Sequence, residues 1–221
     1  MGALLAAMLL SGCSKAQQAP STPPSASVPA SQEPSQPLEP GIGEEEMEHM
    51  LPVLEGIMLA MQGGVKYEPD NPDAVWDLLY CVVYRNGPQG EEAASGEDGS
   101  LIVSRALMER YAIACFANLA QLPEIPVSQQ MLSYDAATEK YILKPSEQGE
   151  EYGEIYAAQT VTTGLYRASV NLFAGDDELP YDQYEFTLVD NDDAANTERP
   201  SFAYAVRGAK KVEMDPGSMA R

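Results

Sequence analysis

Histidine, tryptophan, cysteine and basic residues are all scarce in this chain of 221 residues. It has one His, one Trp and three Cys, and 13 Lys and Arg stand against 34 Asp and Glu, for a formal net charge of −21. One His excludes a metal site built on several histidines. The shortage of positive charge excludes a surface that follows phosphates and argues against nucleic-acid partners, because such proteins bind by neutralising phosphates.

Sequence motifs of the common enzyme classes are also missing. There is no glycine-rich phosphate loop, no Gly-x-Ser-x-Gly, no His-Glu-x-x-His and no Cys-x-x-Cys. The run 190–193, Asp-Asn-Asp-Asp, is similar in composition to a calcium loop, but Ala194 and Ala195 replace a ligand and the turn glycine. We interpret that run as an acidic turn and His49 as a solvated residue on a charged helix. The sequence therefore predicts no catalytic residue, no metal site and no cofactor.

Long apolar runs are absent as well. Residues 3–10 form a run of eight apolar residues, whereas a helix that spans a membrane needs about 20. A short apolar run near the N-terminus, followed by small residues, is typical of a secretory signal.

Leu10-Ser11-Gly12-Cys13 follows that run and resembles the bacterial lipobox. In bacterial lipoproteins a signal peptidase cuts before this cysteine, which carries a diacylglycerol and often a third acyl chain. The resemblance implies that residues 1–12 are a signal peptide and that Cys13 anchors the protein to a cell membrane, on the side facing away from the cytoplasm. Attachment by two or more acyl chains is stable, since each buried methylene contributes about 0.8 kcal/mol. One feature departs from the pattern, because no Lys or Arg precedes the apolar run.

Residues 13–40 join the lipid-carrying cysteine to the rest of the chain. Residues 14–40 hold seven of the 17 prolines, among Ser, Ala, Gln and Thr, and no aromatic residue. Such a composition cannot bury enough apolar surface to offset the entropy of ordering. We predict a disordered tether that spans roughly 30 Å as a flexible coil and reaches roughly 80 Å in polyproline II form.

Residues 41–221 are predicted to fold, and their first half has helical periodicity. Apolar residues at spacings of three and four predict a helix over 44–62, with glutamates in its first turn and Gly63-Gly64 at its end. A second helix is predicted over about 72–86, and it is apolar nearly all round, which indicates burial between two neighbours.

The region after the second helix is rich in Gly, Glu, Ala and Ser. We predict an exposed mobile loop over 87–100. Ser104 is suited to cap a third helix that runs to about residue 120, before a segment with two prolines ends it.

In the second half the apolar period changes to two, which predicts strands. Residues 132–134 are expected to pair with 141–143 through a turn. Further strands are expected over 155–163, 165–173, 183–189 and 201–207. Short turns between neighbouring strands predict an antiparallel meander, so the fold class is α+β: about three N-terminal helices packed on one face of a C-terminal meander. This order is loosely similar to the nuclear-transport-factor-2-like cone, a likeness that implies a curved sheet around helices, often with a pocket.

Cys81 and Cys115 fall in the second and third predicted helices. Export permits a disulfide between them, because disulfides persist in oxidising compartments and packed helices can bring two cysteines together. Two buried thiols that act as small hydrophobic residues are the alternative. Neither cysteine is predicted to be catalytic, because His49 is distant in the sequence and lies among acidic residues.

The function that remains is that of a membrane-anchored lipoprotein whose domain binds a ligand or a protein partner outside the cytoplasm without chemistry. Two alternatives stay open. One is a carboxylate-dependent hydrolase of the cell envelope, which requires two acids about 5–10 Å apart in a cleft. The other is a structural or assembly component without a small-molecule pocket.

Overall fold

The computed structural model describes residues 42–88, 92–146, 149–192 and 202–214. The helices are α1 (Glu44–Gln62), α2 (Pro72–Asn86) and α3 (Arg105–Cys115). The strands are β1 (Ala93–Ser95), β2 (Leu101–Ser104), β3 (Leu132–Asp135), β4 (Lys140–Leu143), β5 (Glu151–Thr162), β6 (Leu165–Ala174), β7 (Asp182–Asp190) and β8 (Tyr204–Val212). The predicted signal peptide, lipidated Cys13 and tether all lie outside the described residues.

The first two helices have the predicted bounds. Asn71 caps α2, because its side-chain oxygen accepts a hydrogen bond from the Asp73 N–H at 3.1 Å. The apolar stripe of α1 is buried, and Met47, Met50 and Met58 are at most 1 % exposed. The methionines of this stripe are therefore core residues within the domain.

The predicted loop over 87–100 and the predicted third helix both need correction. Part of the loop is a strand, β1, which pairs with β2. Ser104 does cap α3, accepting from the Leu107 N–H at 3.1 Å, but the helix ends at Cys115 rather than near 120. It ends there because Phe116 is extended and the Ala117 N–H donates to the Val206 carbonyl at 2.8 Å, which draws the chain toward β8.

The C-terminal meander is confirmed, with strand order β5-β6-β7-β8 and every neighbouring pair antiparallel. The last strand lies a few residues later than the predicted 201–207. Its entry is fixed by Asn191, whose backbone N–H donates to the Ala203 carbonyl and whose side-chain amide donates to the Phe202 carbonyl. These bonds place residues 202 and 203 in the connection between β7 and β8.

The predicted hairpin of β3 and β4 is also confirmed, with Tyr134 opposite Tyr141. It does not join the meander, however. β3 and β4 combine with β1 and β2 in a second four-stranded sheet of order β1-β2-β4-β3. The sequence pattern marks each strand but does not say which strands share a sheet.

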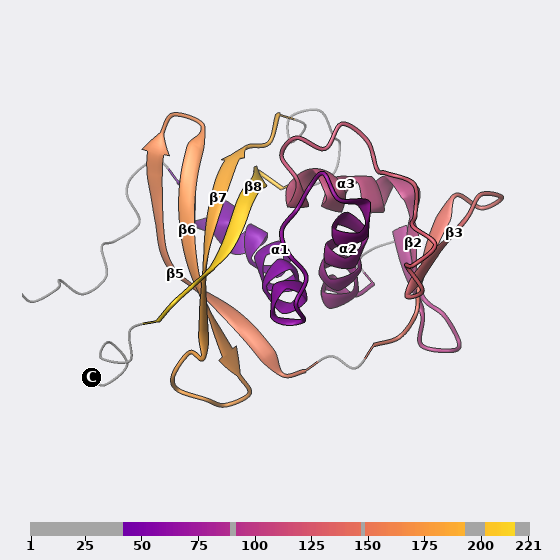
Figure 1. The fold of residues 1–221 in the computed structure, drawn as a ribbon, viewed down its shortest axis with the longest axis horizontal. Helices are drawn as coiled ribbons and strands as arrows, with labels where there is room; N and C mark the ends of the chain where they lie inside the picture. The colour runs from indigo at the N-terminus through magenta and orange to yellow at the C-terminus, as the bar shows by residue number, and fades with distance from the viewer. Residues whose placement is uncertain (1–41, 89–91, 147–148, 193–201, 215–221) are drawn as a thin grey trace, which may run out of the picture. The chain divides into compact units, whose positions relative to one another are not determined.

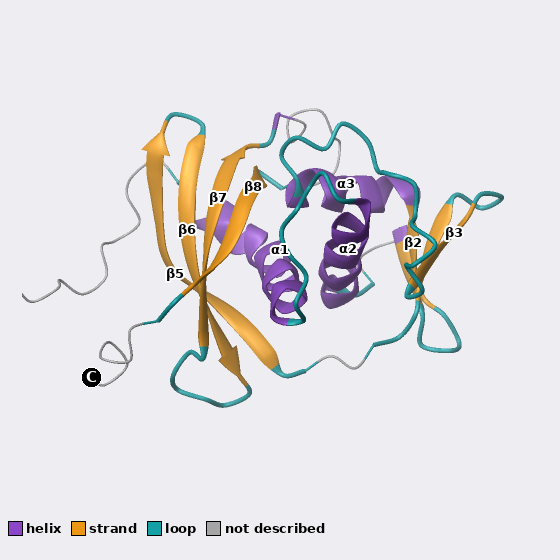
Figure 2. Ribbon diagram, in the orientation of Figure 1, coloured by secondary structure: helices purple, strands orange, loops and turns teal. Residues whose placement is uncertain are grey.

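The helices lie between the two sheets (Figures 1 and 2). On the meander side, the Gly153 N–H of β5 donates to the Glu55 carboxylate of α1 at 2.7 Å. On the other side, the Tyr80 hydroxyl of α2 donates to the Lys144 carbonyl just after β4 at 2.8 Å. The helices therefore cover one face of the meander, as predicted, and also support the smaller sheet. No helix in the described part of the chain has both the length and the hydropathy of a membrane span.

Candidate functional site

A cavity of about 670 Å³ opens between α3, the segment 119–125 and the hairpin of β3 and β4. We call it the α3–β4 groove. Its lining includes Trp76, Arg105, Glu109, Ile113, Tyr134 and Tyr141, together with residues of the segment 119–125. Cavities of roughly 300–1,000 Å³ with apolar and aromatic walls and a few polar groups are the usual size and character of small-molecule sites.

The aromatic wall of the groove is held in place by contacts among its own members. The Tyr141 ring lies 4.7 Å from the Tyr134 ring and 5.5 Å from the Trp76 ring, measured between centroids. Trp76 is 1 % exposed, and its indole N–H lies 3.2 Å from the carbonyl oxygens of both Pro123 and Glu124. The indole thus ties the segment 119–125 to α2, so the groove is formed before any ligand arrives.

One charged pair lies in the wall of the groove. The Arg105 Nε lies 2.7 Å from the Glu109 Oε1, one helical turn away on α3, and the two side chains are 57 % and 44 % exposed. The Glu109 carboxylate, and then the Tyr134 hydroxyl, raise the pKa of the Arg105 guanidinium. Burial, and then the neighbouring Tyr134, raise the pKa of Tyr141. The groove therefore offers a guanidinium, a carboxyl group and the hydroxyls of two tyrosines.

The lining of the groove lacks several of the usual catalytic side chains. Among the residues that line the groove there is no His, Cys, Ser, Thr or Lys that could act as a nucleophile or as a general base near neutral pH. Glu109 forms an ion pair with Arg105. The groove can hold an apolar body against its rings and position one charged end of a ligand.

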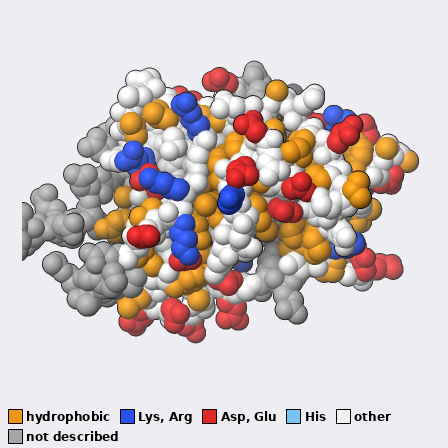
Figure 3. Space-filling model, viewed as in Figure 1, with side chains coloured by type: hydrophobic (Ala, Val, Ile, Leu, Met, Phe, Trp, Pro, Cys, Tyr) orange, Lys and Arg blue, Asp and Glu red, His pale blue; other side chains and the backbone are white. Residues whose placement is uncertain are grey.

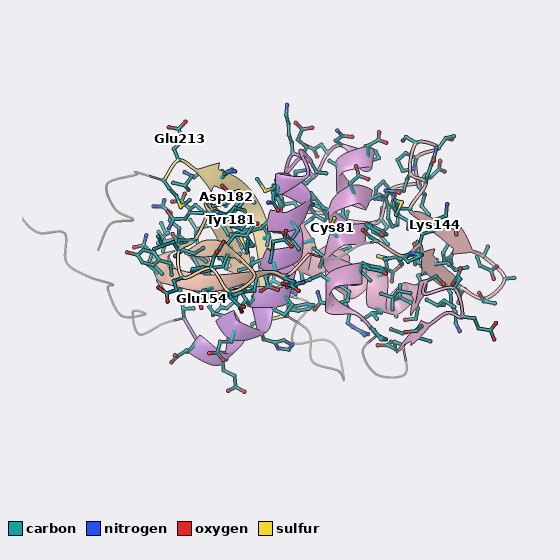
Figure 4. All side chains as sticks on the ribbon, turned by 90° about the horizontal axis from the view of Figure 1, so that it is seen from below. Cys81, Lys144, Glu154, Tyr181, Asp182 and Glu213 are labelled. Atoms are coloured by element: carbon teal, nitrogen blue, oxygen red, sulfur yellow. The ribbon has the colours of Figure 1, made fainter. Side chains whose placement is uncertain are left out.

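The structure places Cys81 and Cys115 on α2 and at the end of α3, as predicted, and both are free thiols. Figure 4 shows Cys81 on α2. Burial, with a smaller contribution from Asp77, raises the pKa of the Cys81 thiol to about 11. Burial also raises the pKa of Cys115, which is fully buried. A nucleophile acts as the thiolate, so neither cysteine has the electrostatic surroundings of a reactive one.

His49 lies on α1, as predicted, whereas the run 190–193 is described only in part and begins with the last residue of β7. His49 is exposed on α1, where its ring lies 5.4 Å from the Phe202 ring. Asp190 accepts a hydrogen bond from the Tyr166 hydroxyl at 2.7 Å, and Asp193 lies outside the described residues. Within the described ranges, no three His, Cys, Asp or Glu side chains are grouped closely enough to hold a metal ion.

The groove itself was not predicted, because its walls come from four separate parts of the chain. The sequence placed Tyr134 and Tyr141 on paired strands and gave Arg105 and Glu109 the spacing of a helical ion pair. The segment 119–125, which closes the groove, was predicted only as the end of a helix. The position of this segment depends on the hydrogen bonds from the Trp76 indole to the carbonyls of Pro123 and Glu124, which lie 47 and 48 positions further along the chain.

No family model, no curated protein and no solved structure matches this chain.

Proposed function

We propose that this protein is an extracytoplasmic lipoprotein, anchored in a cell membrane by lipid on Cys13, whose α+β domain binds a ligand or a protein partner without transforming it. The anchor rests on the lipobox-like run Leu10–Cys13. The binding role rests on one observation above all: the preformed α3–β4 groove has aromatic walls and an Arg105–Glu109 ion pair, but no His, Cys, Ser, Thr or Lys among its lining residues. Its occupant is an amphipathic molecule or a side chain of a partner, with an apolar body and a charged end.

The carboxylate-dependent hydrolase is the weaker proposal. Two acids line the groove, Glu109 and Glu124. A glycoside hydrolase needs one carboxyl group kept protonated as the general acid. Glu109 forms an ion pair with Arg105, and Glu124 is exposed, so neither has the apolar surroundings of such a general acid. The groove therefore supports binding in preference to this chemistry.

Blocking the groove is expected to remove its ligand without unfolding the domain. Ala120 is exposed and lines the groove, so Ala120→Trp fills space rather than crowding the core. On intact cells, a photo-crosslinking amino acid at the exposed, groove-lining Gln121 should capture a ligand or partner in the otherwise unchanged protein. We expect Ala120→Trp to lower that adduct at least tenfold, with no change in melting temperature.

The matched control is Ala136→Trp, on an exposed position in the turn between β3 and β4 that is not part of the groove lining. It should leave the adduct unchanged. Equal adduct yields from the Ala120→Trp, Ala136→Trp and unsubstituted proteins would contradict the assignment of the groove as the binding site.

Removing the anchor is expected to release the protein from the membrane. In Cys13→Ser there is no thiol to accept a diacylglycerol, so the acyl chains that anchor the protein in the bilayer are missing. Metabolically labelled lipid should appear on the unsubstituted protein and vanish from the variant, which should leave the membrane fraction. Cys81→Ser is the control and should keep both the lipid and the location. Equal membrane retention of the two variants would refute the anchor.

A further inference from the structure

Strand β5 forms one edge of the meander. It is the longest described strand, with 12 residues, and it pairs only with β6 among the described strands. An edge strand presents backbone donors and acceptors along its open side, which can pair with another extended segment. Natural proteins protect such edges with bulges, charged side chains or elements that cover them. Whether β5 can pair with another segment therefore depends on what lies beside each part of its edge.

The first part of the edge is closed by a pair of side chains from the helices. The Glu55 carboxylate of α1 accepts from the Gly153 N–H at 2.7 Å, and the Arg85 guanidinium of α2 donates to the Glu151 carbonyl. Glu55 and Arg85 also contact each other, at 3.4 Å, and their side chains are 14 % and 21 % exposed. Both bonded backbone groups face α1 and α2, so this end of the edge is satisfied within the domain.

The next part of the edge borders a cavity of about 330 Å³, between residues 153–157 of β5 and the first turns of α1. We call it the β5 groove. Its accessible apolar surface comes from the partly exposed Leu51 and Ile155, and the buried Met47 borders it. A register shift between Ile155 and Ala157 forms a bulge there, and Tyr156, within the bulge, is 54 % exposed. A large aromatic side chain is thus held in water beside an open strand edge and an apolar hollow.

The charge around the β5 groove has one sign. Three glutamates line the groove: Glu44 and Glu48 of α1 and Glu154 of β5. Its lining residues include no Lys or Arg. All three glutamates are exposed, and Figure 4 shows Glu154 on the sheet near α1. Elsewhere on the meander, basic side chains gather (Figure 3), and Arg167 and Lys210 share Glu185 at 3.7 and 2.8 Å. The acidic rim of this groove therefore contrasts with the basic part of the meander.

We propose that the β5 groove binds an extended, basic segment of another protein, which adds to the edge of the sheet and places an apolar side chain against Leu51 and Ile155. Main-chain pairing supplies affinity in this mode, and pockets for alternate side chains supply specificity. A Lys or Arg beside the apolar residue meets the three glutamates.

Two other occupants fit the groove less well. The chain's own tether has prolines at 34, 37 and 40, which have no N–H to donate, and acidic residues at 33 and 39, which the glutamates of the groove repel. A second copy of the chain carries a net charge of −21 and would bring another acidic rim to the same edge. A basic partner avoids both problems.

The test uses the full lipidated chain in detergent and three synthetic decapeptides. The first alternates Lys and Val, the second alternates Glu and Val, and the third is the Lys-Val peptide methylated on alternate backbone nitrogens. We expect the Lys-Val peptide to bind at low salt, the Glu-Val peptide not to bind, and methylation to weaken binding at least tenfold because it removes the edge hydrogen bonds. Amide exchange at residues 154–157 should slow when the Lys-Val peptide binds.

Matched charge reversals separate the groove from net charge. The double variant Glu48→Lys with Glu154→Lys should lower the affinity for the Lys-Val peptide at least tenfold. The control double variant, Glu178→Lys with Glu213→Lys, changes exposed positions outside the groove and should alter the affinity less than threefold. Equal loss in both double variants, or equal binding of the methylated peptide, would overturn the proposal. Tighter peptide binding after removal of residues 14–40 would also overturn it, because the tether would then be the occupant of the groove. A dimer that the peptide dissociates would overturn it as well, because a second copy of the chain would then be the occupant.

This inference is independent of the α3–β4 groove. Ala120→Trp should leave binding of the Lys-Val peptide unchanged, because residue 120 does not line the β5 groove. Loss of crosslinked ligand in Ala120→Trp together with intact peptide binding supports both sites. Loss of peptide binding in Ala120→Trp would count against the β5 groove alone.

Discussion

A chain that starts at Gly63 is expected to lose cooperative folding, whereas a chain that starts at Gly41 is expected to unfold as the full protein does. The difference between them is α1. Six side chains of this helix are at most 1 % exposed: Met47, Met50, Val53, Leu54, Ile57 and Met58. Burial of each such side chain contributes about 1.5–3 kcal/mol, and a typical domain is stable by only about 5–15 kcal/mol. Removing α1 therefore removes a contribution of the same size as the whole stability.

The loss goes beyond the apolar stripe, because α1 also contributes to the edge of the meander. Without Glu55, the Gly153 N–H and the Arg85 guanidinium each lose a partner at sites that are partly buried. Thermal unfolding followed by near-ultraviolet circular dichroism compares the two chains. A sharp transition of equal midpoint in both would show that α1 is dispensable for the core, and its methionines would then have to be reconsidered as a binding surface.

The sequence predicted the approximate bounds of α1 and α2, and the structure has the same ones, because local signals mark the helix ends. The acidic first turn of α1 and the Asn71 cap of α2 are chemical features of the helix termini themselves. The end of α3 has no such signal. Phe116 leaves the helix because the Ala117 N–H finds a carbonyl on β8, 89 positions further along the chain.

The grouping of strands into two sheets has the same kind of cause. β1 has three residues, two of them exposed, so it carries no alternation that would separate it from a polar loop. It forms because Leu101, Ile102 and Val103 of β2 offer it an edge. The α3–β4 groove also depends on this sheet, since β4 pairs with β2 and its Tyr141 packs against Trp76 of α2. Neither the groove nor the covered end of β5 could be found without these long-range contacts.

Gly56→Ala is the substitution for which helix propensity and packing give opposite answers. Glycine in a helix interior costs about 1 kcal/mol relative to Ala, so propensity alone predicts that the substitution stabilises α1. A Cβ at Gly56, however, would lie 2.4 Å from the Val82 Cα and 2.7 Å from its Cγ2. The first of these atoms is backbone, so α2 as a whole would have to move away from α1. Crowding of this kind costs about 1–3 kcal/mol or more. We expect this cost to exceed the gain in helix propensity.

We therefore expect Gly56→Ala to lower the melting temperature by several degrees, and Gly56→Leu to prevent folding, since about 1 kcal/mol corresponds to roughly 2–4 °C in a domain of this size. Gly63→Ala is the matched control on the same helix. Its Cβ would lie 3.2 Å from the Ala60 carbonyl oxygen, and Gly63 has φ −68°, which any residue adopts. This control should stay within about 1 kcal/mol of the unsubstituted protein, as surface substitutions usually do. A rise in melting temperature for Gly56→Ala would mean that α1 and α2 can separate at little cost, and that propensity rather than close approach sets the stability of this pair.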